Sequence, residues 1–489
     1  MNFESDASKI ITELKNFRQD SLSQTKPVIY QAPLKQIIDE LKLETFVKEG
    51  NLTSNNLARF TKKYLSFTTR LHHPSYLAHQ ATVPHYSGAL GSLIDGFTNN
   101  GMSIYEMGPS AASVEYFMVN WLLKKVGWTP SPIELDKLNS DHKFGGGALT
   151  HGGSNANLTA LIAARSRIAP ETWKEGSPKD LVILAPAGCH YSVQRAAGIM
   201  GMGQNSIYLL DVDDKGAIIP DKINTVYQQV KKDNKRVMAL VANSCSTAVG
   251  VFDPLDEIAL FCMEHDIWLH VDGAHGASAL LSKIHKHRLK GIEKAHSITW
   301  DAHKMLQTPN LCTALLVRDH NYIDQAFEQT GSYIFYEKDQ PGFDFINRTM
   351  ECTKAALGLK LFLVVGALGE KGLAAYIDTL AQTTLDAYEY ISSMPEFTCP
   401  VKPQLNILCF RIDGSDDLQI KIRDRILRDG TFHITSTSFN NVRYLRICIM
   451  NPETDINHIH SLVEEIRVIK STFFVNGLQL NKSQYKLKE

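Results

Sequence analysis

The sequence has 489 residues, of which 44% are hydrophobic and 21% are charged, and its formal net charge at pH 7 is −1. These values are ordinary for a globular protein with a large core, and they exclude a chain that is disordered over most of its length. A nearly neutral chain is not built as a whole to bind nucleic acid or an anionic membrane, so small-molecule chemistry is the favoured class of function.

The N-terminal sequence, MNFESDASKIITELKNF, has early acidic residues and no basic stretch followed by an apolar core. It therefore does not resemble a secretory signal. The eight cysteines form no C-x-x-C pair, and their spacing with histidines is not that of a metal site. We expect a soluble, cytoplasmic protein with reduced thiols, no bound metal and no membrane span.

Three parts are predicted along the chain. Residues 1–105 are expected to be mainly helical, because segments such as PLKQIIDELKL are amphipathic. In residues 106–385, short β-branched runs such as LVILA, RVMALVA and SITW alternate with helix-like segments, which predicts an α/β domain with a mostly parallel sheet. Residues 386–489 change to a mixed pattern of strands and helices that is typical of a smaller α+β domain.

A glycine-rich segment, GGGALTHGGSNANL, leads into an Ala/Leu-rich helix. Gly153 and Ser154 stand at the start of this helix, where backbone N–H groups and the helix dipole favour an anion such as phosphate. The segment is neither G-x-G-x-x-G nor a Walker loop, which weakens a nucleotide-binding interpretation. On its own, such a segment is more often a plain turn.

The next predicted strands each end on a polar residue, and ligands of parallel sheets bind at the carboxyl ends of strands. His190 follows LVILA, and Thr247 lies in the hydroxyl-rich stretch after RVMALVA. Taken singly, these are as easily ordinary loop and turn residues. Asp272 ends the apolar strand WLHVD, where a carboxylate is costly unless it has a cationic partner.

The strand SITW is followed by Asp301, His303 and Lys304. A lone lysine after a strand is usually a solvated loop residue. Here it completes a set of an anion cradle, a flat imidazole, a hydroxyl, a carboxylate and an amine. That set fits pyridoxal 5′-phosphate, which needs an amine for its aldehyde, a carboxylate for its ring nitrogen, a stacking ring and a phosphate cradle.

At this point the sequence resembles the group II pyridoxal-phosphate amino-acid decarboxylases, the family of glutamate, cysteine-sulfinate, aromatic-amino-acid and diaminobutyrate decarboxylases. The motifs are HYSVQRAAG, GVFDPLDEIA, IWLHVDGAHG, LLSKIHKHRLKGIEKAHSITWDAHKM and CTALLVRD, and the resemblance runs from about residue 71 to 466. It implies the aspartate-aminotransferase-like fold of fold-type I pyridoxal-phosphate enzymes. It also implies a homodimer with its active site at the subunit interface.

The resemblance assigns roles to individual residues. Lys304 matches the Schiff-base lysine, Asp272 the partner of the ring nitrogen, and His190 the stacking imidazole. Arg446 and Gln80 match residues that bind the substrate, and a guanidinium such as that of Arg446 can hold an α-carboxylate with two parallel hydrogen bonds. The other implied cofactor contacts come from Gly153, Ser154, Thr247, Ala274 and His303.

Two departures from the family pattern concern charge and the substrate side. Asp301-Ala302 stands where the family usually has Asn-Pro, which puts a negative charge near the expected phosphate. His79 replaces the usual Asn before Gln80, so the assignment of Gln80 is the weaker of the two substrate contacts.

A third departure lies in the loop of residues 340–349, which is expected to close over the active site with a hinge at Pro341-Gly342. Aligning MECTKAALGLKLF without gaps sets Phe343 at the place of a family tyrosine, and Phe cannot donate a proton. Family members with Phe there can make aldehydes by oxidative deamination. Tyr333 or Tyr336 would take the tyrosine's place if the loop register differs.

The interpretation is a decarboxylase that converts an L-amino acid to its amine and CO2. The substrate is expected to be acidic, such as glutamate, aspartate or cysteine sulfinate, or to be diaminobutyrate. Aldehyde formation, a transaminase, and a non-enzymatic interaction protein suggested by the basic stretch SKIHKHRLKGIEK remain as alternatives. The His303-Lys304 pair and His190 favour a decarboxylase over a transaminase, and the neutral overall charge disfavours RNA binding.

Overall fold

The computed structural model describes residues 2–134, 143–327 and 342–485, the last twelve of these by their backbone alone. The chain forms two compact units, one of residues 1–83 with 380–489 and one of residues 84–379. This division rests on spatial contacts between segments, so the three-part organisation expected from the sequence stays a prediction.

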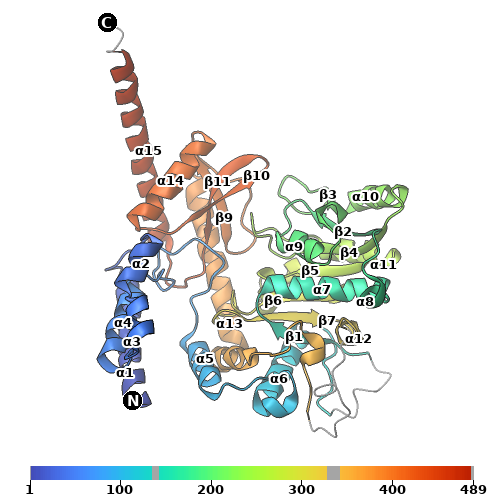
Figure 1. The fold of residues 1–489 in the computed structure, drawn as a ribbon. Helices are drawn as coiled ribbons and strands as arrows, with labels where there is room; N and C mark the ends of the chain where they lie inside the picture. Colours follow the sequence, from blue (N-terminus) through green and yellow to red (C-terminus); the bar gives the residue numbers. More distant parts are fainter. Residues whose placement is uncertain (1, 135–142, 328–341, 486–489) are drawn as a thin grey trace. The chain divides into compact units, whose positions relative to one another are not determined.

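The unit of residues 84–379 is built on a seven-stranded sheet with the order β1-β7-β6-β5-β4-β2-β3 (Figure 1). The strands are β1 Gly146–Thr150, β2 Leu181–Pro186, β3 Ile207–Leu210, β4 Arg236–Asn243, β5 Trp268–Asp272, β6 Ser297–Asp301 and β7 Thr313–Val317. The pairs from β3 to β6 are parallel, whereas β7 is antiparallel to both β6 and β1. The prediction of a mostly parallel sheet is confirmed.

The sequence did not reveal β1, whose glycines looked like part of a turn. They are needed because neighbouring backbone comes very close: a Cβ on Gly147 would lie 2.4 Å from the carbonyl oxygen of Leu315 in β7. Glycine is normally unfavourable within a strand, and close approach of another backbone is one of the reasons for which it is found there.

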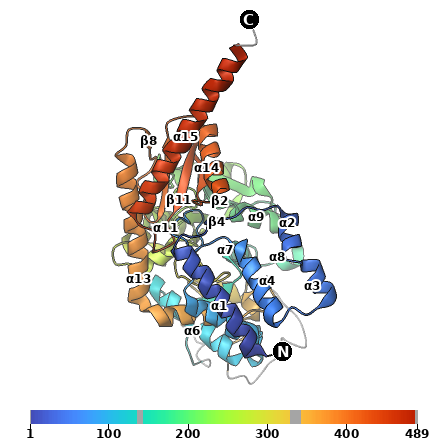
Figure 2. The ribbon, with the colours of Figure 1, turned by 90° about the vertical axis from the view of Figure 1, so that its left-hand side faces the viewer.

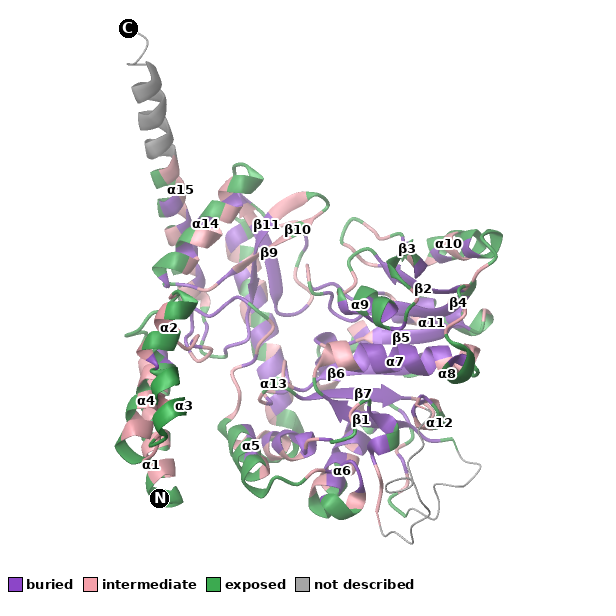
Figure 3. Cartoon of the chain, viewed as in Figure 1, coloured by how far each residue is buried: buried purple, intermediate pink, exposed green. Residues whose placement is uncertain are grey.

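Helices cover this sheet and connect its strands. They are α5 Tyr86–Thr98, α6 Pro109–Val126, α7 Gly153–Ile168, α8 Thr172–Glu175, α9 Ser192–Ile199, α10 Pro220–Lys232, α11 Leu255–Glu264, α12 Asn321–Asp324 and the start of α13 Leu357–Ser392. Helix α7 packs on the middle of the sheet and is buried along most of its length (Figure 3). Its small and apolar residues, such as Ala160 and Leu161, form part of the core.

The other unit contains a four-stranded antiparallel sheet with the order β10-β11-β9-β8. The strands are β8 Phe397–Thr398, β9 Ile407–Ile412, β10 Thr435–Phe439 and β11 Val442–Cys448, and the helices are α1 Phe3–Leu22, α2 Leu34–Glu40, α3 Leu43–Glu49, α4 Ser54–Ser66, α14 Asp416–Asp429 and α15 Ile456–Tyr485. Helices α1 and α4 run side by side (Figure 2). In the described part of the chain, no helix combines the length and the apolar character needed to cross a bilayer.

A buried ion pair supports β1, the edge strand that leads into the glycine-rich turn. The Glu115 side chain on α6 accepts a hydrogen bond from Leu149 N–H at 2.9 Å, and Lys354 Nζ donates to Leu149 C=O at 2.8 Å. Lys354 Nζ also lies 2.7 Å from Glu115 Oε1, and both side chains are almost fully buried. The pair thus satisfies the backbone groups that β1 cannot bond to another strand.

Lys354→Met should lower the free energy of unfolding by about 3–5 kcal/mol, because it leaves the Glu115 carboxylate buried without its partner. Burial already raises the pKa of Glu115, and Lys354 opposes that shift. The double variant Glu115→Gln with Lys354→Met leaves no buried charge and should lose less stability than Lys354→Met alone. Urea unfolding followed by tryptophan fluorescence measures both, and a double variant that is less stable than the single one would contradict this account.

Candidate functional site

A cavity of about 300 Å³ lies at the carboxyl ends of β4, β5 and β6, where Asn243, Asp272 and Asp301 end their strands. All eight residues expected to contact a cofactor line it: Gly153, Ser154, His190, Thr247, Asp272, Ala274, His303 and Lys304. The structure therefore brings together side chains that are spread over about 150 residues of sequence.

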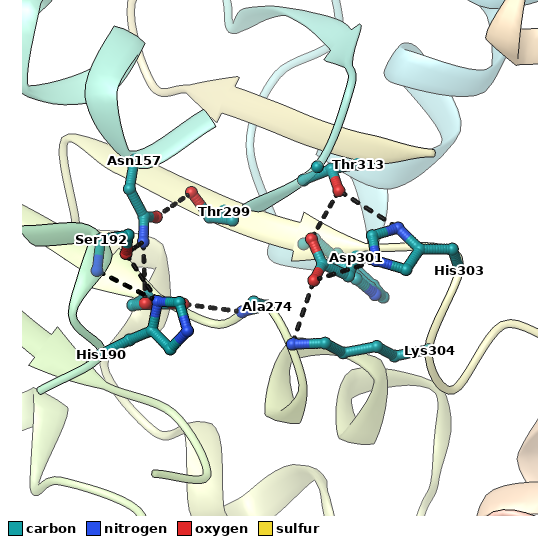
Figure 4. A network of polar contacts seen from close by, with 12 residues as sticks. Asn157, His190, Ser192, Ala274, Thr299, Asp301, His303, Lys304 and Thr313 are labelled. Atoms are coloured by element: carbon teal, nitrogen blue, oxygen red, sulfur yellow. Dashed lines mark hydrogen bonds and ion pairs between the residues drawn. The ribbon is translucent and has the colours of Figure 1, made fainter. Parts of the chain in front are cut away.

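Lys304 follows β6 in a turn, and its ammonium lies 3.1 Å from Asp301 Oδ2 (Figure 4). The Asp301 side chain is almost fully buried and also accepts a hydrogen bond from Thr313 Oγ1 at 2.6 Å. The ring of His303 is held beside this pair, with Nδ1 2.9 Å from the Cys312 carbonyl oxygen and Nε2 3.6 Å from Asp301 Oδ2. The lysine is thus held by a neighbouring carboxylate inside the cavity.

Asp301 also lies against the start of α7. A Cβ on Gly153 would be 3.1 Å from Asp301 Oδ1, which is tighter than an ordinary contact. The carboxylate therefore stands directly beside the helix N-terminus that was predicted to bind an anion. From the sequence, Asp301 is expected near the phosphate, and its side chain lies beside the predicted phosphate cradle.

Asp272 is held by neutral donors. Asn157 Nδ2, one turn into α7, lies 2.8 Å from Asp272 Oδ2, and Ala274 N–H donates to Oδ1 at 3.2 Å. Among the ion pairs of the described residues, no lysine or arginine is joined to Asp272. Its carboxylate is thus oriented by the protein while its charge has no cationic partner from the side chains described.

His190 follows β2, and its Nδ1 lies 2.8 Å from Ser192 Oγ and 3.3 Å from Ser192 N. Burial lowers the pKa of His190 from its ordinary value, and Asp272 opposes that shift. The neutral imidazole is therefore favoured. Asn157 Nδ2 lies 2.9 Å from Ser192 Oγ, so one amide contacts both Asp272 and the hydrogen-bond partner of His190.

The sequence reasoning missed Asn157, although one signal was present. Gly153 and Asn157 are four residues apart on a predicted helix, so they share one face. An asparagine on the buried face of an apolar helix requires hydrogen-bond partners, and these turned out to be the site itself.

Arg446 and Gln80 both belong to the other unit. Arg446 Nη1 on β11 donates to the Ala78 carbonyl oxygen at 3.1 Å, and its side chain is buried. The ring of His79 lies 5.5 Å from that of His433, and burial together with Arg446 lowers the pKa of His79. The substrate-binding roles of Arg446 and Gln80 stay predictions.

Phe343 lines a second cavity of the 84–379 unit, of about 600 Å³. Its ring packs 5.2 Å from that of Tyr116 and beneath the guanidinium of Arg348 at 4.4 Å. Gly342 is packed on Tyr105, since a Cβ there would lie 2.1 Å from the tyrosine ring. The described residues lining the 300 Å³ cavity do not include Phe343. Its role over an active site stays a prediction, and Tyr333, Tyr336 and Pro341 lie outside the described residues.

The family described as pyridoxal-dependent decarboxylase conserved domain matches residues 42–413 of this chain. Acidic amino acid decarboxylase GADL1 of Xenopus tropicalis is 28% identical over 488 residues, covering 95% of this chain and 91% of that protein. L-2,4-diaminobutyrate decarboxylase of Acinetobacter baumannii is 24% identical over 442 residues, covering 86% of this chain and 84% of that protein.

Solved structures share the fold. The crystal structure of mouse CSAD superposes with a TM-score of 0.84 at 24% identity, covering 95% of this chain and 98% of that one. The glutamate decarboxylase domain of a Vibrio parahaemolyticus protein, a diaminobutyrate-pyruvate transaminase and L-2,4-diaminobutyrate decarboxylase, gives a TM-score of 0.80 at 26% identity, covering 96% and 95%.

Proposed function

The chain belongs to the pyridoxal-dependent decarboxylase family, and from this premise we propose that it removes the α-carboxyl group of an acidic L-amino acid as CO2 and releases the amine. Glutamate, aspartate and cysteine sulfinate are the proposed substrates, with 2,4-diaminobutyrate as the competing candidate. The enzyme class and the cofactor, pyridoxal phosphate, follow from the family. The observation that carries the proposal is the gathering of an amine, a carboxylate, an imidazole and a helix N-terminus around one cavity.

The residues present fit pyridoxal phosphate. Asp272 is an oriented carboxylate that no described lysine or arginine neutralises, as suits a cationic ring nitrogen. Lys304 offers an amine to the same cavity, and Gly153 with Ser154 opens the α7 N-terminus to it. When bound, the cofactor supplies an aldehyde that bonds to amines and a ring that accepts the electron pair left at Cα when CO2 departs.

The roles of the chain's own residues follow from this fit. Lys304 holds the cofactor, and Asp272 keeps the proton on the ring nitrogen, because a carboxylate favours the protonated form of a nearby base. His190, as a neutral imidazole, would contact the ring of the bound cofactor. Arg446 would hold the substrate α-carboxylate and so orient the bond that is to be broken.

Relatives support the acidic side chain. The Xenopus protein is named for acidic amino acids, whereas the Acinetobacter protein acts on diaminobutyrate and is less similar. The family and the two relatives reported above are described as decarboxylases, which favours that activity over the transaminase and the non-enzymatic interaction protein. In the structure, Lys290 and Lys294 of the basic stretch both pair with Asp256, so part of its charge is neutralised.

A homodimer, a cytoplasmic location and the absence of a nucleic-acid partner are proposed as well. The dimer rests on the family resemblance, in which each subunit completes the other's active site. An aldehyde product is the second candidate function, and the observation that favours it is a phenylalanine at position 343.

Incubating the protein and pyridoxal phosphate separately with glutamate, aspartate, cysteine sulfinate and 2,4-diaminobutyrate should release CO2 from at least one acidic substrate, with the amine as main product. Following CO2, amine, aldehyde and peroxide together distinguishes amine formation from aldehyde formation.

Lys304→Ala should lower turnover by at least about 100-fold, since the cofactor loses its attachment. Borohydride reduction should leave the cofactor on the peptide that contains Lys304; a label on another lysine would remove it from this role.

Asp301→Asn should tighten the binding of pyridoxal phosphate by about tenfold, equivalent to about 1.4 kcal/mol, because it removes a negative charge beside the predicted phosphate cradle. Fluorescence titration of the cofactor-free protein measures the dissociation constant. The matched control is Glu351→Gln, which neutralises a half-buried carboxylate that accepts from Asn155 at 3.0 Å, and it should change the constant less. Unchanged or weaker binding by Asp301→Asn would show that the carboxylate does not oppose the phosphate.

Phe343→Tyr should raise the amine-to-aldehyde ratio by about tenfold or more, because a phenol at this position can protonate Cα. Tyr336→Phe should leave the ratio nearly unchanged. If Tyr336→Phe loses amine formation and Phe343→Tyr leaves the product ratio unchanged, the proton donor is residue 336. Product analysis by chromatography on the active substrate of the panel decides between them.

A further inference from the structure

We propose that Asn157 is a positioning residue that, through one side-chain amide, fixes both the orientation of the Asp272 carboxylate and the tautomer of His190. The inference rests on the roles proposed for Asp272 and His190. It concerns how buried hydrogen bonds fix the orientation of Asp272 and the protonated nitrogen of His190 before the cofactor binds (Figure 4).

The direction of the amide is set by Asp272. An ionised carboxylate only accepts hydrogen bonds, so the Asn157 atom 2.8 Å from Asp272 Oδ2 must be the donor Nδ2. The other end of the amide is then the carbonyl oxygen Oδ1. It accepts a hydrogen bond from Thr299 Oγ1 at 2.6 Å, which agrees with this orientation.

The same orientation defines the protonation of His270. Its Nε2 lies 3.0 Å from Asn157 Oδ1, an acceptor, so Nε2 carries the hydrogen. Its Nδ1 then accepts from Ser297 Oγ at 2.8 Å, and Ser297 Oγ accepts in turn from Trp268 Nε1 at 2.9 Å. Burial lowers the pKa of His270 to about 4, so this neutral tautomer is the stable form. The carbonyl oxygen of the amide thus accepts from Thr299 and His270, in a chain of hydrogen bonds that begins at the Trp268 N–H, which can only donate.

On the cavity side, the second Nδ2 hydrogen faces Ser192 Oγ at 2.9 Å. Ser192 Oγ accepts that hydrogen and directs its own to His190 Nδ1, and the Ser192 backbone N–H points to the same nitrogen. Nδ1 of His190 is therefore an acceptor, and the single hydrogen of the neutral ring stands on Nε2. Asn157 and Ser192 together select this tautomer.

The arrangement leaves Asp272 ready for a cationic partner. Asn157 and the Ala274 N–H each occupy one lone pair of its two oxygens, and neither neutralises its charge. These hydrogen bonds fix the direction of the Asp272 carboxylate, which is proposed to keep the ring nitrogen protonated.

The test compares Asn157→Leu with Asn157→Asp in the holoenzyme. Asn157→Leu should lower kcat by about 100-fold with KM within about threefold, and the loss should be the same at every pH. Asn157→Asp should recover in part as the pH falls, because a protonated carboxyl reproduces two of the amide's contacts: its carbonyl oxygen faces His270 and its single O–H donates to Asp272, while the donation to Ser192 is lost. At higher pH the new carboxylate repels Asp272, so activity declines. The titratable groups facing residue 157 are Asp272 and His270, with His190 reached through Ser192.

A readout independent of turnover is the absorption spectrum of the bound cofactor without substrate. It should change with pH in Asn157→Asp more than in the wild type, since the proton on the ring nitrogen affects the absorbing system. Ser192→Ala separates the effect of Asn157 on His190 from its effect on Asp272. It should lower kcat by about threefold to tenfold through His190 and leave the spectrum unchanged.

The matched control Ser278→Ala removes an equally buried hydrogen bond, Trp300 Nε1 to Ser278 Oγ at 2.8 Å, and should leave kcat within about twofold.

Turnover is measured on the panel amino acid that releases CO2, and circular dichroism confirms folding. A wild-type protein that releases no CO2 overturns the proposed function. An active wild type whose Asn157→Asp variant keeps the wild-type pH profile and spectrum overturns the positioning role alone. If Asn157→Leu fails to fold, Asn157→Asp and Ser192→Ala still decide the question, because each retains a polar or small side chain at its site.

Discussion

The organisation of the site depends on one constraint: a carboxylate, Asp272, ends a buried strand, and the side chains and backbone groups described around it hold it by neutral donors. Removing a carboxylate from water without a counter-charge is unfavourable, and proteins usually answer with a cation or with several hydrogen bonds. Here Asn157 and the Ala274 backbone supply the hydrogen bonds, and the nearest described lysine in the cavity, Lys304, pairs with a different carboxylate, Asp301. The two carboxylates therefore have different partners, although they end neighbouring parallel strands.

This separation follows from the sheet. Strands β5 and β6 are parallel, so Asp272 and Asp301 emerge at the same edge, whereas β7 runs back antiparallel and places Thr313 beside Asp301. The edge strand β1 then returns toward the cavity and delivers the turn before α7. Its outer backbone groups are satisfied by the buried pair of Glu115 and Lys354, so the cradle is anchored from the side that has no strand neighbour.

Much of this could be predicted from the sequence. Six apolar runs, from LVILA to TALLV, are strands of the sheet. The polar residues that follow four of them, β2, β4, β5 and β6, meet in one cavity, because these strands are parallel and present their carboxyl ends at one edge. The resemblance then gave those residues individual roles. The strand β1 was not predictable from local pattern, because its glycines reflect the close approach of Leu315, which is more than 160 residues away in sequence.

Asn157 and Phe343 show the same limit in the site. A helical asparagine gives no local sign of whether it caps, faces water or joins a network, and its partners Asp272, Thr299 and His270 come from distant strands. Phe343 was placed by alignment to a loop, and in the structure its ring lies among the aromatic side chains of a separate cavity. Alignment fixes sequence position, whereas the surroundings of a loop residue depend on contacts that a single sequence does not contain.

The Asp301–Lys304 pair has a consequence for cofactor loading. A lysine attacks an aldehyde as the neutral amine, and an adjacent carboxylate favours its ammonium form. In the role proposed for Lys304, attachment of the cofactor breaks an ion pair whose carboxylate is almost fully buried, and Asp301 keeps the hydrogen bond from Thr313 and the neighbouring ring of His303. An incoming phosphate at the start of α7 would meet this same carboxylate. With the phosphate at its proposed place, the helix dipole and the backbone N–H groups attract it while Asp301 opposes it, so we expect two opposing effects on cofactor affinity at one helix terminus.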